Sequence, residues 1–490
     1  MSAIPSRSLP TVSVVSGPAT VDSLSVVVRS AEPGRPPRGL AAEARVDVHD
    51  GHPVIEVELD ETVPRAGWAG AVDHGLGHRR AGAALARHLR DSRRAQSVEV
   101  TVPDVVPLDR VGDLVLGYLL GARGQDVYAA QPSPPAPDLV VRTVSEIGSD
   151  DDEDAVARAV AVAVKSAEAT SLARDLAGAP SDLKTPEWLV ARMSEVLVAA
   201  GMQTTVIDGE ELVTGGFGGV LAVGGGSDNA PRVLVARRPG SGPRVLLVGK
   251  GITFDTGGIS VKPAEGMHLM RTDMAGSAAV AAAAATFCSN PTGAHEDLDL
   301  TVVVPSAENM LSGSAYRPGD VVTHVDGTTS EITNTDAEGR MVLADALAHG
   351  IEVCDPEVVV DVATLTGAMK VALGMRTGAV MATDDDLADR VALAGATSGE
   401  RWWRLPLPED LRPAVRSDIA DIHQAPKGPG AITAALFLEK FVGGRPWAHL
   451  DIAGPARSPE EIDEVGPVAT GFATRTLLGL LRDLAERPRS

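Results

Sequence analysis

Three segments of the chain concentrate carboxylate, lysine and arginine side chains near the expected ends of strands and helices. The segments are 249–262, 271–274 and 334–340, and their carboxylates are Asp255, Asp273, Asp336 and Glu338. Carboxylates that converge without cations repel one another and raise one another's pKa. Two divalent metal ions about 3.5–4 Å apart would remove that repulsion and could activate a water molecule. The segments contain no histidine or cysteine, so the donors suit Mn²⁺ or Mg²⁺, and also Zn²⁺.

Lysine is scarce in this chain, which makes its positions informative. Only seven of the 44 basic residues are lysine, and two of them, Lys250 and Lys262, lie in the first segment. A neutral lysine amine can bind a metal ion, whereas a guanidinium stays protonated and cannot. A lysine that keeps its charge can stabilise an oxyanion, and the planar fork of Arg340 suits a bidentate oxyanion. These residues predict a two-metal hydrolytic site.

Other kinds of site fit the sequence less well. Residues 249–251 lack the Walker spacing of a P-loop, and the glycine-rich stretch 224–232 lacks the spacing of a dinucleotide site. A two-metal phosphoesterase is an alternative, but it needs a cationic phosphate clamp beyond Lys262 and Arg340. The net charge of −22 argues against nucleic acid or an anionic membrane as the main partner.

The expected strands and helices place the three segments at the edge of a sheet. From about residue 177 onward, strand-like apolar runs alternate with alanine-rich helices, which predicts a three-layer α/β domain around a mixed central sheet. The expected strands are 232–238, 244–255, 299–309, 357–367 and 447–454, and the expected helices include 274–287 and 341–352. Ligands collect at the carboxyl ends of strands in open α/β sheets, where these segments fall.

The first 148 residues are predicted to form a separate unit. Five apolar runs predict strands, the amphipathic run 78–94 predicts a helix, and 109–122 predicts a second, more buried helix, so we expect a small α/β domain. The acidic run 149–154 opens a stretch typical of a long helix, where its carboxylates complement the helix dipole. We therefore expect an N-terminal domain over 1–148, a linking helix over 149–176 and a catalytic domain over 177–490.

Cysteine usage and the lack of an apolar leader predict a cytoplasmic location. Cys288 and Cys354 are too few for a disulfide framework and lie in or beside apolar runs. The start of the chain shows no basic segment followed by an apolar one, and the apolar stretch 274–287 is too short to cross a bilayer. We expect a soluble protein with no membrane partner.

The motifs resemble those of the leucyl (cytosol) aminopeptidase family. The resemblance covers about residues 170–480 and rests on GKGITFDTGGISVKP, TDMAGSAAV, PSAENMLSGSAYRPGDV, NTDAEGRMVLADAL, VATLTGA, AGPA and GAITAALFLEKF. NTDAEGR is highly specific by itself, and together with GKGITFD it makes a strong match. The first 150 residues or so resemble the family only in length and α/β character.

The resemblance implies a role for each site residue. The five metal ligands would be Lys250, Asp255, Asp273, Asp336 and Glu338. Asp255 and Glu338 would bridge two divalent ions, Mn²⁺ or Zn²⁺ with Mg²⁺ as an alternative. Lys262 would stabilise the gem-diolate, and Arg340 would hold a bicarbonate ion that acts as general base. The substrate site would be lined by Thr364, Leu365, Thr366 and Gly367.

The resemblance also implies an activity and an assembly. It implies an aminopeptidase that removes leucine or other large apolar residues from peptides with a free N-terminus. It implies a macro-like N-terminal domain and a homohexamer whose active sites face an interior cavity. A member can double as a DNA-binding regulatory protein, an alternative that the charge of −22 and the lack of a basic patch oppose. Thr256, 275–277, Met341 and His423 depart from the family pattern, but none is a ligand.

Overall fold

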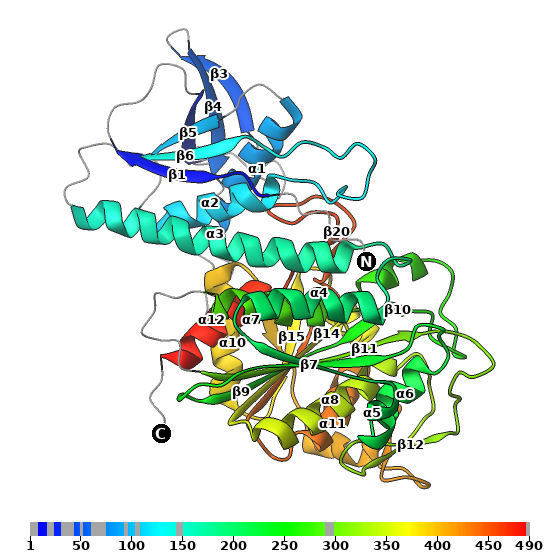
Figure 1. Ribbon diagram of the computed structural model, residues 1–490. Helices are drawn as coiled ribbons and strands as arrows, with labels where there is room; N and C mark the ends of the chain where they lie inside the picture. Colours follow the sequence, from blue (N-terminus) through cyan, green and yellow to red (C-terminus); the bar gives the residue numbers. More distant parts are fainter. Residues whose placement is uncertain are drawn as a thin grey trace.

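The computed structural model describes residues 8–16, 24–30, 44–49, 52–59, 75–92, 97–102, 108–143, 150–289 and 298–486. Two sheet-containing units lie on either side of a long helix, α3 (Asp150–Gly178) (Figure 1). The acidic run occupies the first turns of this helix, as its sequence position predicts. The expected α/β class and the mixed central sheet are both confirmed. No helix within the described ranges combines the length and the apolar character needed to cross a membrane.

The first unit is a six-stranded sheet with helices packed against it. Its strands have the order β1-β6-β5-β2-β4-β3, and only β3 and β4 pair antiparallel. The elements are β1 (Val12–Ser16), β2 (Leu24–Ser30), β3 (Ala44–His49), β4 (His52–Leu59), α1 (Leu76–Ser92), β5 (Ser97–Val102), η2 (Leu108–Arg110), α2 (Val111–Gly121) and β6 (Asp138–Thr143). The sequence analysis missed β3, a short edge strand whose run is weakly apolar.

The second unit is built on a nine-stranded mixed sheet. Eight strands have the order β16-β15-β18-β14-β9-β11-β8-β7, and β10 pairs with β11. Their bounds are β7 (Gln203–Asp208), β8 (Arg232–Arg238), β9 (Arg244–Gly249), β10 (Gly251–Asp255), β11 (Asp299–Asn309), β14 (Val358–Ala363), β15 (Thr377–Ala382), β16 (Arg401–Arg404) and β18 (Trp447–Asp451). The central strands β11, β9, β14 and β18 run parallel, so their carboxyl ends meet at one edge.

Helices cover both faces of this sheet (Figure 1). One face packs against α3, α4 (Pro186–Ala199), α7 (Ala275–Cys288), α10 (Asp385–Ser398) and α12 (Thr474–Ala485). The other face packs against α6 (Gly218–Gly224), α8 (Glu338–Cys354), α9 (Gly367–Leu373) and α11 (Gly430–Leu438). The remaining short elements are α5 (Gly209–Thr214), η3 (Met267–Thr272), β12 (Val321–Thr323), β13 (Thr329–Glu331), η4 (Glu409–Val415), β17 (Ile422–His423), η5 (Glu439–Phe441), β19 (Arg457–Ser458) and β20 (Val468–Ala469).

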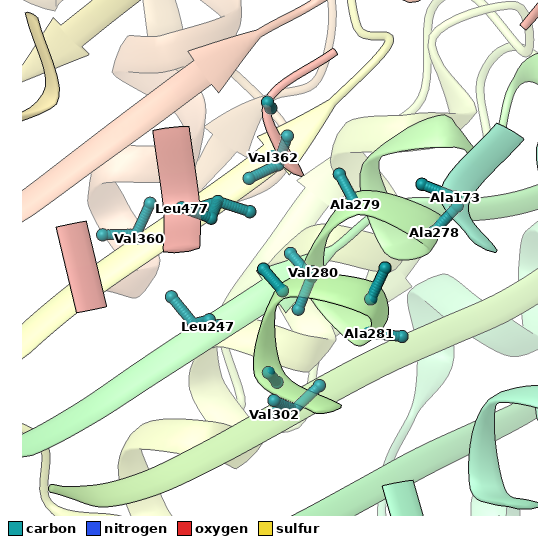
Figure 2. Close-up of a cluster of buried hydrophobic side chains, with 14 of the residues drawn as sticks. Ala173, Leu247, Ala278, Ala279, Val280, Ala281, Val302, Val360, Val362 and Leu477 are labelled. Atoms are coloured by element: carbon teal, nitrogen blue, oxygen red, sulfur yellow. The ribbon is translucent and has the colours of Figure 1, made fainter. Parts of the chain in front are cut away.

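Small residues let α7 approach the sheet closely. Figure 2 shows its alanines and Val280 packed near Leu247 of β9 and strand β14. At the start of the helix, a Cβ atom on Gly276 would lie 2.1 Å from the carbonyl oxygen of Val362, so only glycine fits there. This close approach brings Asp273, two residues before α7, to the carboxyl edge of the sheet.

Arginines join the first unit to a loop of the second. The side chain of Arg80 on α1 forms an ion pair with Asp463, with Nε 2.9 Å from Oδ1. Arg174 of α3 donates to the carbonyl oxygens of Leu120, Glu464 and Thr470 at 2.9–3.0 Å. The linking helix therefore contacts both units through one buried guanidinium.

We predict that Glu464→Gln destabilises this junction. The buried carboxylate of Glu464 lies 3.4 Å from Arg475 and 3.9 Å from Arg79. Removing one partner of a buried ion pair typically costs several kcal/mol, but each arginine here keeps a second carboxylate, Glu400 or Asp113. We expect the free energy of unfolding in urea at pH 7 to fall by about 2 kcal/mol.

The same substitution should have a defined pH dependence. Burial would raise the pKa of Glu464, but Arg475 and Arg79 outweigh it and hold the pKa below its usual value. A group with a depressed folded-state pKa stabilises the fold above its unfolded pKa and loses that contribution as the pH falls through the folded pKa. The difference between wild type and variant should hold from pH 7 to about pH 5 and shrink below about pH 4. A difference that grows in acid would contradict the assignment.

Candidate metal centre

The three sequence segments converge at the carboxyl edge of the central sheet. Lys250 interrupts the expected strand 244–255 between β9 and β10, and its N–H donates to the carbonyl oxygen of Val362 on β14 at 3.0 Å. Asp255 ends β10, Asp273 follows η3, and Glu338 begins α8. Helix α8 begins at Glu338, earlier than the expected 341–352, so Glu338 and Arg340 lie in its first turn.

Carboxylate oxygens from three of these residues form a compact cluster. One ligand atom each from Asp255, Asp336 and Glu338 lies within 4.8 Å of the others. Asp273 joins them through Lys250, whose Nζ lies 2.8 Å from Asp273 Oδ2 and 2.7 Å from Glu338 Oε1. All five predicted metal-binding side chains therefore lie in one place.

Lys262 bridges the other side of the cluster. Its Nζ lies 2.6 Å from Asp255 Oδ2 and forms an ion pair with Asp336. Its side chain is partly exposed, whereas Lys250 and Glu338 are almost fully buried. The two ammonium groups compensate four carboxylates only in part, so the cluster carries excess negative charge.

The electrostatics of the cluster reflect burial and crowding. Burial raises the pKa of Asp255 well above its usual value, and repulsion from Glu338 and Asp273 adds to the shift. Burial also raises the pKa of Asp273, to about 6, against the opposing effect of Lys250. Burial would lower the pKa of both Lys250 and Lys262, but the surrounding carboxylates outweigh it and raise them. Both lysines are therefore charged while no metal ion is bound.

These residues fit divalent cations. Glu338 Oε2 is buried and accepts no hydrogen bond from the described part of the chain. An unpartnered buried carboxylate oxygen is costly, and a metal ion would satisfy it. Carboxylates with one amine nitrogen form a donor set for Mn²⁺, Zn²⁺ or Mg²⁺.

Arg340 presents a buried guanidinium beside the cluster. Its Nη1 donates to the carbonyl oxygen of Gln424 at 2.7 Å, while Nε has no acceptor within the described ranges. Burial lowers the pKa of Arg340 to about 10, with Glu338 and Asp451 acting in the opposite direction. The side chain stays charged at neutral pH, so its free donor edge fits a small planar anion.

Two amides that hold this site were missed by the sequence analysis. Asn309 Nδ2 donates to Asp255 Oδ1 at 2.7 Å and to the carbonyl oxygen of Thr335 at 3.0 Å. Gln424 Oε1 accepts from the N–H groups of residues 333 and 334, and its Nε2 donates to the carbonyls of residues 334 and 337. Asn309 lies within the quoted PSAENMLSG motif, whereas no sequence pattern singles out Gln424.

The predicted substrate-lining segment adjoins the cluster. Thr364 donates to Asp273 Oδ1 at 2.7 Å, and its carbonyl oxygen accepts from Lys250 at 3.0 Å. Asp451, at the end of β18, accepts from the N–H groups of Leu365 and Thr366 at 3.1 Å and from the Thr366 hydroxyl at 2.7 Å. Gly367 then begins α9. Thr366 thus has a structural role, and the backbone of the segment is held rigidly.

Comparisons with known proteins now identify the family. The model described as the cytosol aminopeptidase family, catalytic domain, matches residues 171–478. The chain belongs to the cytosol aminopeptidase family. The family resemblance noted from the motifs is confirmed, and the chain is a metal-dependent aminopeptidase that acts on peptides.

Individual relatives of this cytosol aminopeptidase cover most of its length. The probable cytosol aminopeptidase of Nocardia farcinica is 44% identical over 380 residues, which is 75% of this chain and 73% of the relative. That of Syntrophotalea carbinolica is 41% identical over 410 residues, 82% of each chain. Among solved structures, the bottromycin maturation enzyme BotP in complex with Mn has a TM-score of 0.79 at 37% identity, covering 95% of this chain and 100% of that chain.

We predict that Mn²⁺ stabilises this cytosol aminopeptidase through Asp336. A ligand present at 100 times its Kd stabilises a folded protein by about 2.7 kcal/mol per site. Asp336→Asn should remove at least half of the Mn²⁺-induced rise in Tm, because it removes one of the clustered carboxylates. The exposed Asp418→Asn serves as control and should keep the full rise. An equal rise in both variants would exclude Asp336 as a ligand.

We predict that Asp451→Asn impairs substrate use without impairing metal binding. The amide NH₂ of the variant would face the N–H of Thr366, so the segment loses an acceptor. We expect kcat/KM to fall roughly tenfold, since one lost charged hydrogen bond is worth about 1.5 kcal/mol. Calorimetric Mn²⁺ affinity should match that of Asp384→Asn, which alters a distant helix cap. Loss of Mn²⁺ affinity in Asp451→Asn alone would contradict this role.

Proposed function

We propose that the protein removes leucine or another large apolar residue from the N-terminus of peptides at a two-metal centre. The observation that carries the proposal is the largely buried cluster of four carboxylates and two lysines, with Lys262 and Asp336 partly exposed, in a chain of this family. Lys250, Asp255, Asp273, Asp336 and Glu338 would hold the two ions. Bound ions polarise a scissile carbonyl and lower the pKa of the attacking water. The Mn ion in the BotP structure makes Mn²⁺ the first choice to test, followed by Zn²⁺ and Mg²⁺.

Lys262 and Arg340 would perform the chemistry that belongs to the chain itself. Lys262 has a raised pKa and a partly exposed ammonium, so it can meet the negative charge that develops on the gem-diolate. Arg340 would bind bicarbonate, which supplies the general base, through the donor edge that its contact with Gln424 leaves free. Each role uses a cation whose position is already fixed by the fold.

The preference for apolar residues rests on the surroundings of Asp273. Met267 and Met270 of η3 are half-buried and lie just before this residue in the chain. Methionine side chains adapt to varied apolar partners, which suits a pocket for a large aliphatic residue. Residues 364–367, held by Asp451, would bind the peptide backbone beside it.

The remaining proposals follow from family membership. We propose a macro-like N-terminal domain over 1–148, a linking helix over 149–176 and a catalytic domain over 177–490. We also propose a homohexamer with active sites facing its interior, located in the cytoplasm. The relatives' name, cytosol aminopeptidase, supports the location.

Hydrolysis of leucine p-nitroanilide with Mn²⁺ or Zn²⁺ tests the proposed function. We expect Lys262→Met to lower kcat by 10²–10³, the usual effect of removing one oxyanion donor, and Glu338→Ala to abolish metal-dependent turnover. The control is Lys440→Met, an exposed lysine of η5, which should keep the wild-type rate. The proposal fails if the metal-loaded wild type shows no turnover, or if Lys262→Met keeps the full rate.

A further inference from the structure

Lys184 is a fully buried lysine outside the carboxylate cluster. Its Nζ donates to the carbonyl oxygens of Ala177 at 2.7 Å, Ala179 at 3.2 Å and Leu176 at 3.4 Å, and also to that of Arg271. Its side chain has no solvent exposure and forms no ion pair within the described ranges. A buried cation without a carboxylate is uncommon, so its contacts need an explanation.

The four carbonyls belong to two different segments. Those of Leu176, Ala177 and Ala179 lie at the end of α3, where a helix leaves carbonyls without intrahelical partners and carries partial negative charge. The carbonyl of Arg271 belongs to η3, 87 residues after Lys184. One ammonium group therefore ties the end of the linking helix to η3.

η3 is the turn that places Asp273. The N–H of Asp273 donates to the carbonyl oxygen of Met270 at 3.1 Å, and the Thr272 hydroxyl donates to that of Leu269 at 2.8 Å. These bonds close the turn on itself but attach it to nothing else. Within the described ranges, two side chains from outside η3 donate hydrogen bonds to its carbonyl oxygens. These are Lys184, which donates to Arg271, and Arg457, which donates to Leu269 at a longer 3.4 Å.

We propose that Lys184 is a positioning residue of the metal centre, which holds η3 against the linking helix and so places the Asp273 carboxylate beside Lys250. The inference rests on the proposed two-metal function, since it assigns to Lys184 the placement of one of the ligands. The Nζ of Lys184 is occupied by four carbonyl oxygens, so Lys184 is not a ligand itself.

An ammonium group suits this task better than the alternatives. It is compact and has three rotatable donors, so it can serve carbonyls that converge from separate segments. Burial, and then the charge of Arg271, lower the pKa of Lys184 well below its usual value. The carbonyl oxygens around Nζ act in the opposite direction, because they can only accept hydrogen bonds and therefore favour the charged amine. A guanidinium is planar and larger, and the pocket has no exposed side into which it could extend.

Mn²⁺ binding by Lys184→Met tests the proposal. Methionine has a similar length but cannot donate, so Asp273 should lose its fixed position. Residues that orient metal ligands typically contribute 10–100-fold in affinity, and we expect Kd for Mn²⁺, measured by titration calorimetry, to rise at least about tenfold. The matched control is Lys165→Met, an exposed lysine on α3, the helix whose end Lys184 contacts, and it should bind Mn²⁺ as the wild type does.

A second control separates positioning from loss of stability. Leu480→Ala creates a cavity in the core beneath α12 and should lower Tm at least as much as Lys184→Met. If Lys184 only stabilises the fold, both variants will bind Mn²⁺ with wild-type affinity at 25 °C, and that result overturns the proposal. Weaker binding in Lys184→Met alone supports it.

If Lys184→Met does not fold, Lys184→Gln keeps two N–H donors without the charge, and the same comparison of Kd applies to it. If the wild type itself binds no Mn²⁺, Zn²⁺ or Mg²⁺, the proposed function fails together with this inference. If the wild type binds metal and both Lys184 variants match it, only this inference fails.

Discussion

The crowding of four carboxylates at one edge of a sheet, three of them buried and Asp336 partly exposed, is the constraint on which the rest of this structure depends. Like charges in a low-dielectric site repel strongly, and Lys250 and Lys262 compensate them only in part. A fold that keeps this cluster together must fix each carboxylate by other means. It does so with hydrogen bonds such as that from Asn309 to Asp255 and that from Thr364 to Asp273. The site is therefore preorganised for cations.

Close packing, in addition to hydrogen bonds, sets the positions of the site residues. Gly249 lets β9 approach Ser277 of α7, and Gly276 lets α7 approach Val362 of β14, until a Cβ atom on either glycine would overlap backbone atoms. Lys250 follows one of these glycines and Asp273 precedes the other, so tight packing in the core sets the distance between two site residues. Alanine along the rest of α7 continues the contact over the sheet (Figure 2). Core and site are thus coupled, because moving the helix would move the carboxylate of Asp273.

The sequence was sufficient for those parts of the fold that depend on local pattern or on a contiguous motif. Apolar runs predicted β8 and β11 with their observed bounds, and NTDAEGR located Asp336 and Glu338. The break at Lys250 was missed because 244–255 reads as one continuous apolar strand. Gln424 was missed because its role arises from contacts about 90 residues away in the chain, which no local pattern encodes.

The chain uses its two kinds of cation for different geometries. Three of its seven lysines, Lys184, Lys250 and Lys262, lie where oxygen atoms converge on one point from separate segments. A compact ammonium with rotatable donors can occupy such a point, and a planar fork cannot. Arginine instead serves at the junction between the units, where three nitrogen atoms of the Arg174 guanidinium donate to three carbonyl oxygens. In this arginine-rich chain, these three lysines lie where oxygen atoms crowd around a small volume, which is also the condition for binding a metal ion.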